Sequence, residues 1–531
     1  MKKTQWLTAV LVSAALALTA CSGGGGSRDD AGKDEIVFAD TTYWGTWQNQ
    51  SIQSYQSGNV AHSLLARLVY NDAEKQQIVP WLAEKFSAND DYTEFTFTLR
   101  PGVTFSDGTK LDAKVVKANF DLWGHGDEKR GIIKGVYFGD YDHTEIVDDS
   151  TVKVFLKDTD ANFLYALSAV FYGVQSQANL DLSLEEQQKL DNIKGAGPYV
   201  LDHYTADQEI VLKRRDDYAW APETSENQGK AHIEKIVFRY VPEISSRSGA
   251  IVSGQADLAR VIHPDDEKRI KDSGGEILPV PGYELTAYLG ALRPDNPQLR
   301  DLNVRRALQY TFNIKEILST LATDSYPAPT GIFTRSEDGV DVEVPYDPDR
   351  ARQLLDDAGW KPGKDGIREK DGVKLKLDTD DEVQSPASLP IWEAIAQDWR
   401  KQLGVELVIH KGDVQYSRNA WYDPKVPVHL LRQWNYDGTA SLFGGRDGVG
   451  FSVTLQKKPD QKILDLAKRE RKALDPAEQK QIRKELNQYV VLDQAYVLPT
   501  FSERQIFASN GKVDVPFTGA TYPDFYNATF K

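Results

Sequence analysis

The stretch FTFTLRPGVTFSDGT, residues 95–109, decides the fold class of this 531-residue chain because it joins a strand, a turn and a helix start. Apolar residues alternate with threonines over residues 95–99, which is the period-two pattern of a half-buried strand. Residues 106–108, Ser-Asp-Gly, are typical of a turn. Asp112 then stands where it would cap an amphipathic helix that ends near Gly124. The stretch therefore predicts a strand followed by a helix.

The same alternation of strands and helices continues along the chain. Further strand patterns are a hairpin over residues 144–156 and a strand over residues 405–411. Residues typical of helix starts or ends are Asn313, Asp347 with Pro348, Gly359, Gly404 after a helix over 389–403, and Asp475 with Pro476. These elements predict a mixed α/β (α+β) protein with several domains.

Composition excludes several classes of function. The chain has 40% hydrophobic and 27% charged residues, a mean hydropathy of −0.49, and 63 basic against 79 acidic side chains, net −16. An acidic surface repels phosphate backbones, so we expect no nucleic-acid partner. A single cysteine excludes an intrachain disulfide and any cysteine-clustered metal site.

The N-terminus has the features of a bacterial lipoprotein signal. Two lysines at positions 2 and 3 precede an apolar stretch over residues 6–18, which is too short to span a bilayer. Leu-Thr-Ala-Cys, residues 18–21, resembles a lipobox, and a Gly/Ser tether follows. We therefore expect a signal peptide over 1–20, lipid on Cys21, a tether over 21–33, and a protein held outside the cytoplasm. The alternative is a nonlipidated signal peptide with a chance cysteine.

Six ordered blocks together resemble extracellular solute-binding protein family 5, the oligopeptide- and dipeptide-binding receptors of ABC importers. The blocks are VPWLAEKF (79–86), FTFTLRPGVTFSDGT (95–109), GAGPY (195–199), SGQAD (253–257), NVRRAL (303–308), and the segment from Tyr346-Asp347-Pro348 to Ala358-Gly359-Trp360. Three of the blocks also have structural explanations: residues 99–103 form a turn between strands, Gly197-Pro198 breaks the chain before a strand, and Asp347 caps a helix.

The resemblance implies a periplasmic-binding-protein type II fold, a two-lobed clamp that closes on its ligand. Lobe I would comprise residues 34–63, 190–282 and 501–531, with an inserted subdomain at 64–189, and lobe II would comprise 283–500. The implied partners are a small-molecule or peptide ligand and the importer's permease with its ATPase subunits. We expect a monomer that needs no cofactor, binds no metal and touches the membrane through its lipid only.

The best candidate for a ligand contact is Asp437, in the segment WNYD at 434–437. This segment resembles the one in which peptide-binding members place an aspartate, three residues after Trp434, against the ligand's α-ammonium. An ammonium in a closed cleft needs an opposite charge. The segment departs from the family pattern after Asp437, where Gly-Thr-Ala-Ser follows instead of a proline-containing acidic stretch.

Other ligand contacts are expected around this segment. If residues 430–434 form a strand, Arg432 shares a face with Trp434 and could bind a ligand carboxylate; the alternative is an exposed strand edge. Aromatic walls are expected from Tyr436, Tyr283 and Trp47, although most aromatic side chains are buried in cores.

Three other functions stay open. Some family members capture nickel or metal chelates, for which His429 is the candidate ligand; an ordinary strand histidine is the alternative. A secreted hydrolase is a reading from a different class, but the chain has no His-Glu-x-x-His, Gly-x-Ser-x-Gly or Walker A motif, so we expect no enzyme. A chaperone or sensor on the same scaffold is the third.

Overall fold

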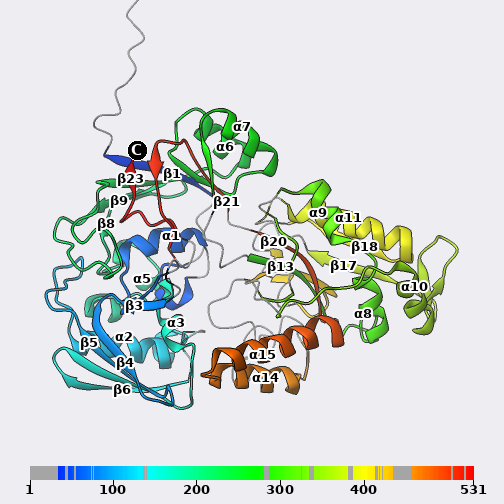
Figure 1. The fold of residues 1–531 in the computed structure, drawn as a ribbon, viewed down its shortest axis with the longest axis horizontal. Helices are drawn as coiled ribbons and strands as arrows, with labels where there is room; N and C mark the ends of the chain where they lie inside the picture. Colours follow the sequence, from blue (N-terminus) through cyan, green and yellow to red (C-terminus); the bar gives the residue numbers. More distant parts are fainter. Residues whose placement is uncertain are drawn as a thin grey trace, which may run out of the picture. The chain divides into compact units, whose positions relative to one another are not determined.

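The computed structural model (Figure 1) describes the chain from Asp34 to Lys531, apart from several segments, and Glu35–Lys531 forms one compact unit. The segments outside the description are 1–33, 42–45, 53–54, 73–74, 76, 136–137, 139, 280–285, 324–325, 330, 334–339, 381–384, 386, 413–415, 418, 421–422, 434–455, 459, 504–505, 519–521 and the side chains of 279, 286–287 and 431–433. None of the helices in the described part has the length and apolar character needed to cross a bilayer.

Seven strands form the first sheet, in the order β12-β21-β11-β1-β10-β9-β8. Their bounds are β1 Glu35–Asp40, β8 Tyr199–Thr205, β9 Glu209–Arg214, β10 Lys235–Tyr240, β11 Leu258–Arg260, β12 Glu276–Pro279 and β21 Ile506–Ser509. The central strand β1 runs parallel to both of its neighbours, β10 and β11. The carboxyl ends of these three strands therefore meet at one edge of the sheet.

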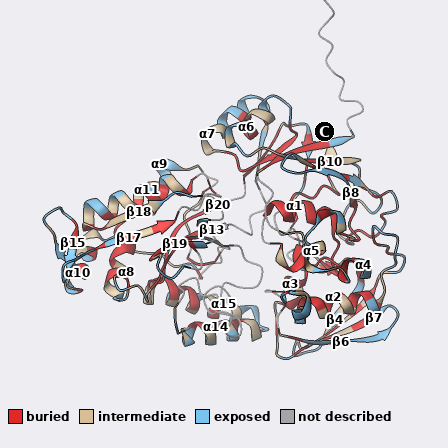
Figure 2. Cartoon of the chain, turned by 180° about the vertical axis from the view of Figure 1, so that it is seen from behind, coloured by how far each residue is buried: buried red, intermediate tan, exposed pale blue. Residues whose placement is uncertain are grey.

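Three helices belong to the first sheet: α1 Tyr55–Leu64, α6 Ile244–Val252 and α7 Pro264–Asp272. Every residue of α1 is buried, as the red ribbon in Figure 2 shows. Such a helix is covered on all sides, so its polar side chains need partners inside the protein.

A four-stranded sheet, ordered β4-β5-β7-β6, contains the predicted strand at residues 95–99 as part of β5. Its elements and neighbours are β2 Val69–Asp72, β3 Gln77–Pro80, β4 Ala83–Ala88, β5 Glu94–Leu99, α2 Ala113–His125, β6 Tyr141–Asp148, β7 Thr151–Leu156, α3 Phe163–Leu167, α4 Gln177–Leu180, α5 Leu184–Gln187, and the 3-10 turns η1 Asn49–Ser51, η2 Glu128–Arg130, η3 Val170–Tyr172 and η4 Leu190–Asn192. The predicted cap is confirmed, since Asp112 accepts a hydrogen bond from the Val115 amide at 2.9 Å. The predicted hairpin is also confirmed, as β6 and β7 pair antiparallel.

Five strands form the second sheet, in the order β18-β17-β19-β13-β20. Its elements are β13 Thr286–Leu292, α8 Leu302–Gln309, α9 Ile314–Leu321, α10 Pro348–Asp357, β17 Lys376–Asp380, α11 Ser388–Asp398 with η5 Trp399–Leu403, β18 Glu406–His410, β19 Val428–Gln433, α14 Gln461–Lys472, α15 Pro476–Asn487 with η6 Gln488–Asp493, and β20 Val497–Glu503. Minor strands are β14 Lys361–Pro362, β15 Arg368–Lys370, β16 Val373–Lys374, β22 Val513–Asp514 and β23 Thr529–Phe530.

The predicted helix starts in this region are confirmed. Asn313, Asp347 and Asp475 each accept a hydrogen bond from an amide of the first turn of α9, α10 and α15. Gly404 adopts a positive φ of 69° after η5, the left-handed conformation that favours glycine. The mixed α/β class predicted from the sequence is therefore confirmed.

Candidate functional site

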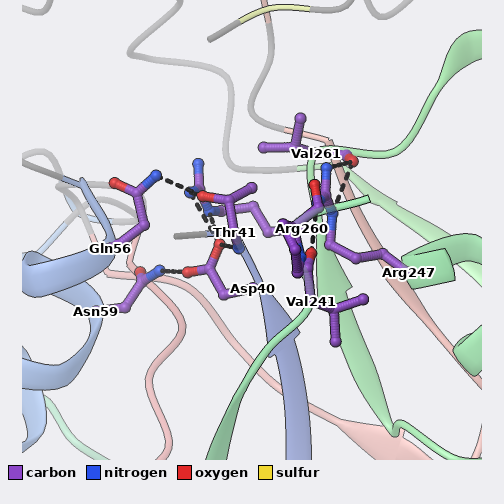
Figure 3. A network of polar contacts seen from close by, with 9 residues as sticks. Asp40, Thr41, Gln56, Asn59, Val241, Arg247, Arg260 and Val261 are labelled. Carbon is purple, nitrogen blue, oxygen red and sulfur yellow. Dashed lines mark hydrogen bonds and ion pairs between the residues drawn. The ribbon is translucent and has the colours of Figure 1, made fainter. Parts of the chain in front are cut away.

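The carboxyl edge of the first sheet carries a buried ion pair (Figure 3). Asp40 ends β1 and Arg260 ends the neighbouring β11. The Arg260 Nε donates to Asp40 Oδ1 at 2.9 Å, and the two side chains are 2% and 0% exposed. The carboxyl ends of parallel strands are where open α/β sheets place their ligand sites. The pair therefore marks a candidate site.

Two amide side chains of helix α1 form hydrogen bonds with residues at the same edge. Asn59 Nδ2 donates to Asp40 Oδ2 at 2.9 Å, and Gln56 Nε2 donates to the hydroxyl of Thr41 at 2.5 Å. Because a carboxylate only accepts, the Asn59 amide must point its nitrogen at Asp40. We call Asp40, Thr41, Gln56, Asn59, Arg247 and Arg260 the edge cluster.

Arg247, on α6, completes the edge cluster by hydrogen bonds to backbone carbonyls. Its guanidinium donates to the carbonyls of Val241 at 2.7 Å, Pro242 at 2.8 Å and Val261 at 3.0 Å. Burial lowers the pKa of Arg247 to about 10, against the opposing effect of Asp40. A pKa of about 10 leaves this arginine charged at neutral pH.

Val261 is held in a strained backbone conformation at this edge. Its φ is +57°, a left-handed value that a β-branched side chain rarely adopts. Such strain costs about 1–3 kcal/mol and persists only where the surroundings impose it. The hydrogen bonds from Arg247 to the Val261 carbonyl and from the Val261 amide to the Ile506 carbonyl supply that constraint.

The second sheet holds a comparable buried group, the histidine cluster, made of Arg293, Asp380, Ser417 and His429. Asp380 ends β17, and its carboxylate accepts from His429 Nδ1 at 2.9 Å and from the Ser417 hydroxyl at 2.8 Å. Arg293 donates to the carbonyls of Val426 at 2.8 Å and Ala420 at 3.0 Å, and also to that of Asp423. Burial lowers the pKa of Arg293 to about 10, and Asp380 opposes the shift.

Most ligand contacts predicted from the sequence lie outside the described residues. This applies to Asp437, Trp434, Tyr436 and Tyr283, as it does to the lipidation candidate Cys21. Their roles stay predictions.

Two predicted contacts fall on described parts of the chain. The backbone of Arg432 lies in β19, opposite Tyr288 of β13, but its side chain is not described. The strand spans 428–433 where the sequence predicted 430–434. Trp47 is partly buried and packs against the core cluster that the first sheet shares with the four-stranded sheet. The packing agrees with the core explanation that applies to most aromatic side chains.

The metal candidate His429 is 1% exposed and donates to Asp380. Within the described residues no group of three or more His, Cys, Asp or Glu side chains is arranged to hold a metal ion. His429 thus matches the alternative of a strand histidine held by an internal hydrogen bond.

Apart from His429, which the sequence offered as a metal ligand, sequence reasoning missed the residues of both clusters. A signal for Asp40 was available, because an acid ending the apolar run Ile-Val-Phe-Ala at 36–39 is costly to bury unless it is paired. No comparable signal identified Arg260, which lies 220 residues away in the sequence. Arg293 and Asp380 likewise meet only in the folded chain.

The two mixed sheets with their helices define a class of protein, the two-lobed, type II fold of periplasmic binding proteins. A family comparison matches residues 77–444 to the bacterial extracellular solute-binding proteins, family 5 Middle. That match covers more than half of the chain, so the protein belongs to this family, as the six sequence blocks predicted.

Named relatives have diverse ligands. Heme-binding protein A of Haemophilus influenzae is 28% identical over 56% of this chain and 56% of its own length. The dipeptide-binding protein of Escherichia coli is 27% identical over 65% of each chain. The match therefore spans less than two thirds of either relative. The crystal structure of NikA from Brucella suis with Fe(III)-EDTA has a TM-score of 0.77 at 22% identity, covering 93% of this chain and all of that one, which shows a common fold.

Proposed function

We propose that this protein is the substrate-binding receptor of an ABC importer, which captures a small solute between two lobes and delivers it to a membrane permease. The observation that carries the proposal is the family match over residues 77–444. A receptor of this kind binds without turnover, in keeping with a family defined by solute binding and with the expectation that the chain is not an enzyme.

The proposed mechanism is a shift between open and closed lobes. Ligand favours closure because both lobes contact it only in the closed state. We keep the predicted division into lobe I, its insertion at 64–189 and lobe II as a proposal. In support, the strands of the first sheet come from 35–279 and 506–509, and those of the second sheet from 286–503. Strand β20, which ends at Glu503, belongs to the second sheet, so lobe II is proposed to extend to the end of β20 and not to residue 500.

We further propose a peptide or similar amine-bearing ligand, with Asp437 as the partner of its ammonium group. In support, β19, which precedes this segment in the sequence, is parallel to β17, so the carboxyl ends of these two strands lie at the same edge of the second sheet. A metal chelate is the second candidate, favoured by the fold that the chain shares with the Fe(III)-EDTA complex. The internal hydrogen bond of His429 disfavours direct metal ligation by that residue.

Replacing Asp437 tests the ligand class. If its carboxylate pairs with an ammonium in a dry cleft, Asp437→Ala weakens binding by about 2–5 kcal/mol, or roughly 30- to 4,000-fold. Native mass spectrometry of the purified protein would first identify any copurified ligand. Calorimetric titration would then compare a dipeptide with a free amino terminus against its N-acetylated form, which lacks the charge.

The acetylated dipeptide gives the design its internal control. Acetylation should weaken binding to the parent protein about as much as Asp437→Ala does, and should have little further effect in that variant. Asp465→Ala, at an exposed acid of α14, is the matched control and should bind like the parent. Equal affinity of parent and Asp437→Ala for the free dipeptide would remove Asp437 from the site.

We also propose that Cys21 carries the lipid that holds the receptor at the outer face of the cell membrane. Cys21→Ala should release the protein into the soluble fraction of the cell envelope, because one or more acyl chains are lost while residues 35–531 are unchanged. Cell fractionation with immunoblotting measures this. Membrane retention of the variant would contradict the anchor.

A further inference from the structure

A polar contact outside both clusters connects the inserted sheet to the region of the second sheet. Segment 158–162 lies between β7 and α3, whereas α14 packs against α15 and the core of that second region. The Asp158 carboxylate lies 2.5 Å from Lys472 Nζ and 3.8 Å from Lys468 Nζ. About 310 residues of chain separate these partners.

The contact also completes the end of helix α14. The last turn of a helix leaves carbonyl groups without partners inside the helix. The Ala161 amide donates to one of them, the Arg471 carbonyl, at 2.9 Å. Lys472 lies in this last turn, where positive charge is favoured by the helix dipole, and Lys468 lies one turn earlier. Segment 158–162 therefore acts as a C-terminal cap supplied from elsewhere in the chain.

Both sides of the contact are ordered by their own hydrogen bonds. Asp160 Oδ1 accepts from the Asn162 amide at 3.0 Å, which shapes segment 158–162. On α14, Glu470 is 2% exposed and accepts from Arg483 of α15 at 3.0 Å, and its other oxygen lies 3.4 Å from Asn162 Nδ2. Lys472 lowers the pKa of Asp158, as expected for an acid that is paired in this conformation.

We propose that segment 158–162 and the last turn of α14 form a latch that stabilises the closed arrangement of the two lobes. The latch rests on the proposed two-lobe mechanism. A contact biases the equilibrium between open and closed lobes only if its two sides separate when the lobes open. Segment 158–162 belongs to the insertion of lobe I and α14 belongs to lobe II, so the contacts of the latch join the two lobes. The latch therefore adds to whatever the ligand contributes to closure.

Spin-label distance measurements test the latch without any ligand. Nitroxide labels on cysteines replacing Lys114 of α2 and Lys480 of α15, both exposed, would report the distance between the lobes. The Cys21→Ala background removes the chain's own cysteine. Asp158→Lys should shift the equilibrium toward longer distances by about two- to fivefold, the range measured for exposed ion pairs.

A charge swap and a matched pair make the test decisive. Adding Lys472→Asp to Asp158→Lys should restore the parent distance distribution. Glu94→Gln, which breaks the Glu94–Lys153 pair of similar exposure inside the inserted sheet, should change nothing. The latch is refuted if Asp158→Lys leaves the distribution unchanged, if the swap does not restore it, or if the control shifts it equally. Because the readout is a distance, a wrong ligand assignment leaves the test intact, and failure of the test leaves the receptor proposal standing.

Discussion

The edge cluster of the first sheet and the histidine cluster of the second sheet each bury an aspartate and an arginine, but the aspartates have different direct partners. In each, an aspartate ends a parallel strand, Asp40 in β1 and Asp380 in β17, and its carboxylate is buried. In each, a buried arginine, Arg247 or Arg293, donates to three backbone carbonyls, and burial lowers its pKa to about 10. Both clusters thus hold an acid and an arginine out of water.

The difference lies in the direct partner of each acid. Asp40 is paired at 2.9 Å with Arg260, a side chain that is always charged, whereas Asp380 receives one ring N–H from His429. Removing Asp40 would therefore leave a buried charge without its counter-ion. Removing Asp380 would remove the acceptor of the Ser417 hydroxyl and of the His429 ring N–H. The two aspartates should differ in what their loss costs.

The largest expected effect is that of Asp40→Ala. Arg260 would stay buried and charged without its carboxylate, and truncating one partner of such a pair typically costs about 3–5 kcal/mol of unfolding free energy. Urea denaturation at neutral pH, followed by tryptophan fluorescence, measures the loss. The double variant Asp40→Leu with Arg260→Met removes both charges and should recover most of it.

A smaller loss is expected for Asp380→Ala in the histidine cluster. The Ser417 hydroxyl and the His429 N–H lose their acceptor, which costs about 1–3 kcal/mol when no charge is stranded. The same urea experiment gives the value. If Asp380→Ala were as destabilising as Asp40→Ala, the distinction between an arginine partner and a histidine partner would be wrong, and Arg293 would have to be treated as the counter-ion of Asp380.

The smallest effect concerns the pH dependence of the first sheet's helix α1. Burial and then the neighbouring Arg67 lower the pKa of His62 well below its ordinary value, and His62 Nδ1 lies 3.2 Å from an Arg67 nitrogen that can only donate. The unfolded chain therefore binds more protons than the folded one below about pH 6.5. The stability that depends on neutral His62 is complete above that pH and is lost as the pH falls toward the lowered pKa.

His62→Asn tests this pH dependence because it keeps an acceptor for Arg67 and removes the titration. Its unfolding free energy should fall less between pH 7 and pH 5 than that of the parent, measured by urea denaturation at several pH values. His203→Asn, at an exposed histidine beside Asp202, is the control and should follow the parent. Identical pH profiles for His62→Asn and the parent would contradict the assignment.

Local sequence determined most of the secondary structure. The alternation at residues 95–99, the cap at Asp112 and the proline-containing starts of α10 and α15 all form as predicted, because each depends on residues within one turn or one strand. The helix α2 runs to His125 and not to Gly124, since the cap falls on Gly126, whose φ is +68°. Errors of this size come from competition between neighbouring cap residues.

Only the tertiary structure decided which distant side chains meet. Asp40 and Arg260 lie on adjacent strands that are 220 residues apart in sequence, and Asp380 meets His429 because β17 and β19 are neighbours in the sheet. The Ala161 amide finds the end of α14 in the same way. Charge and hydrogen-bonding capacity are properties of each residue, but their partners are set by strand order and packing, which local patterns do not encode.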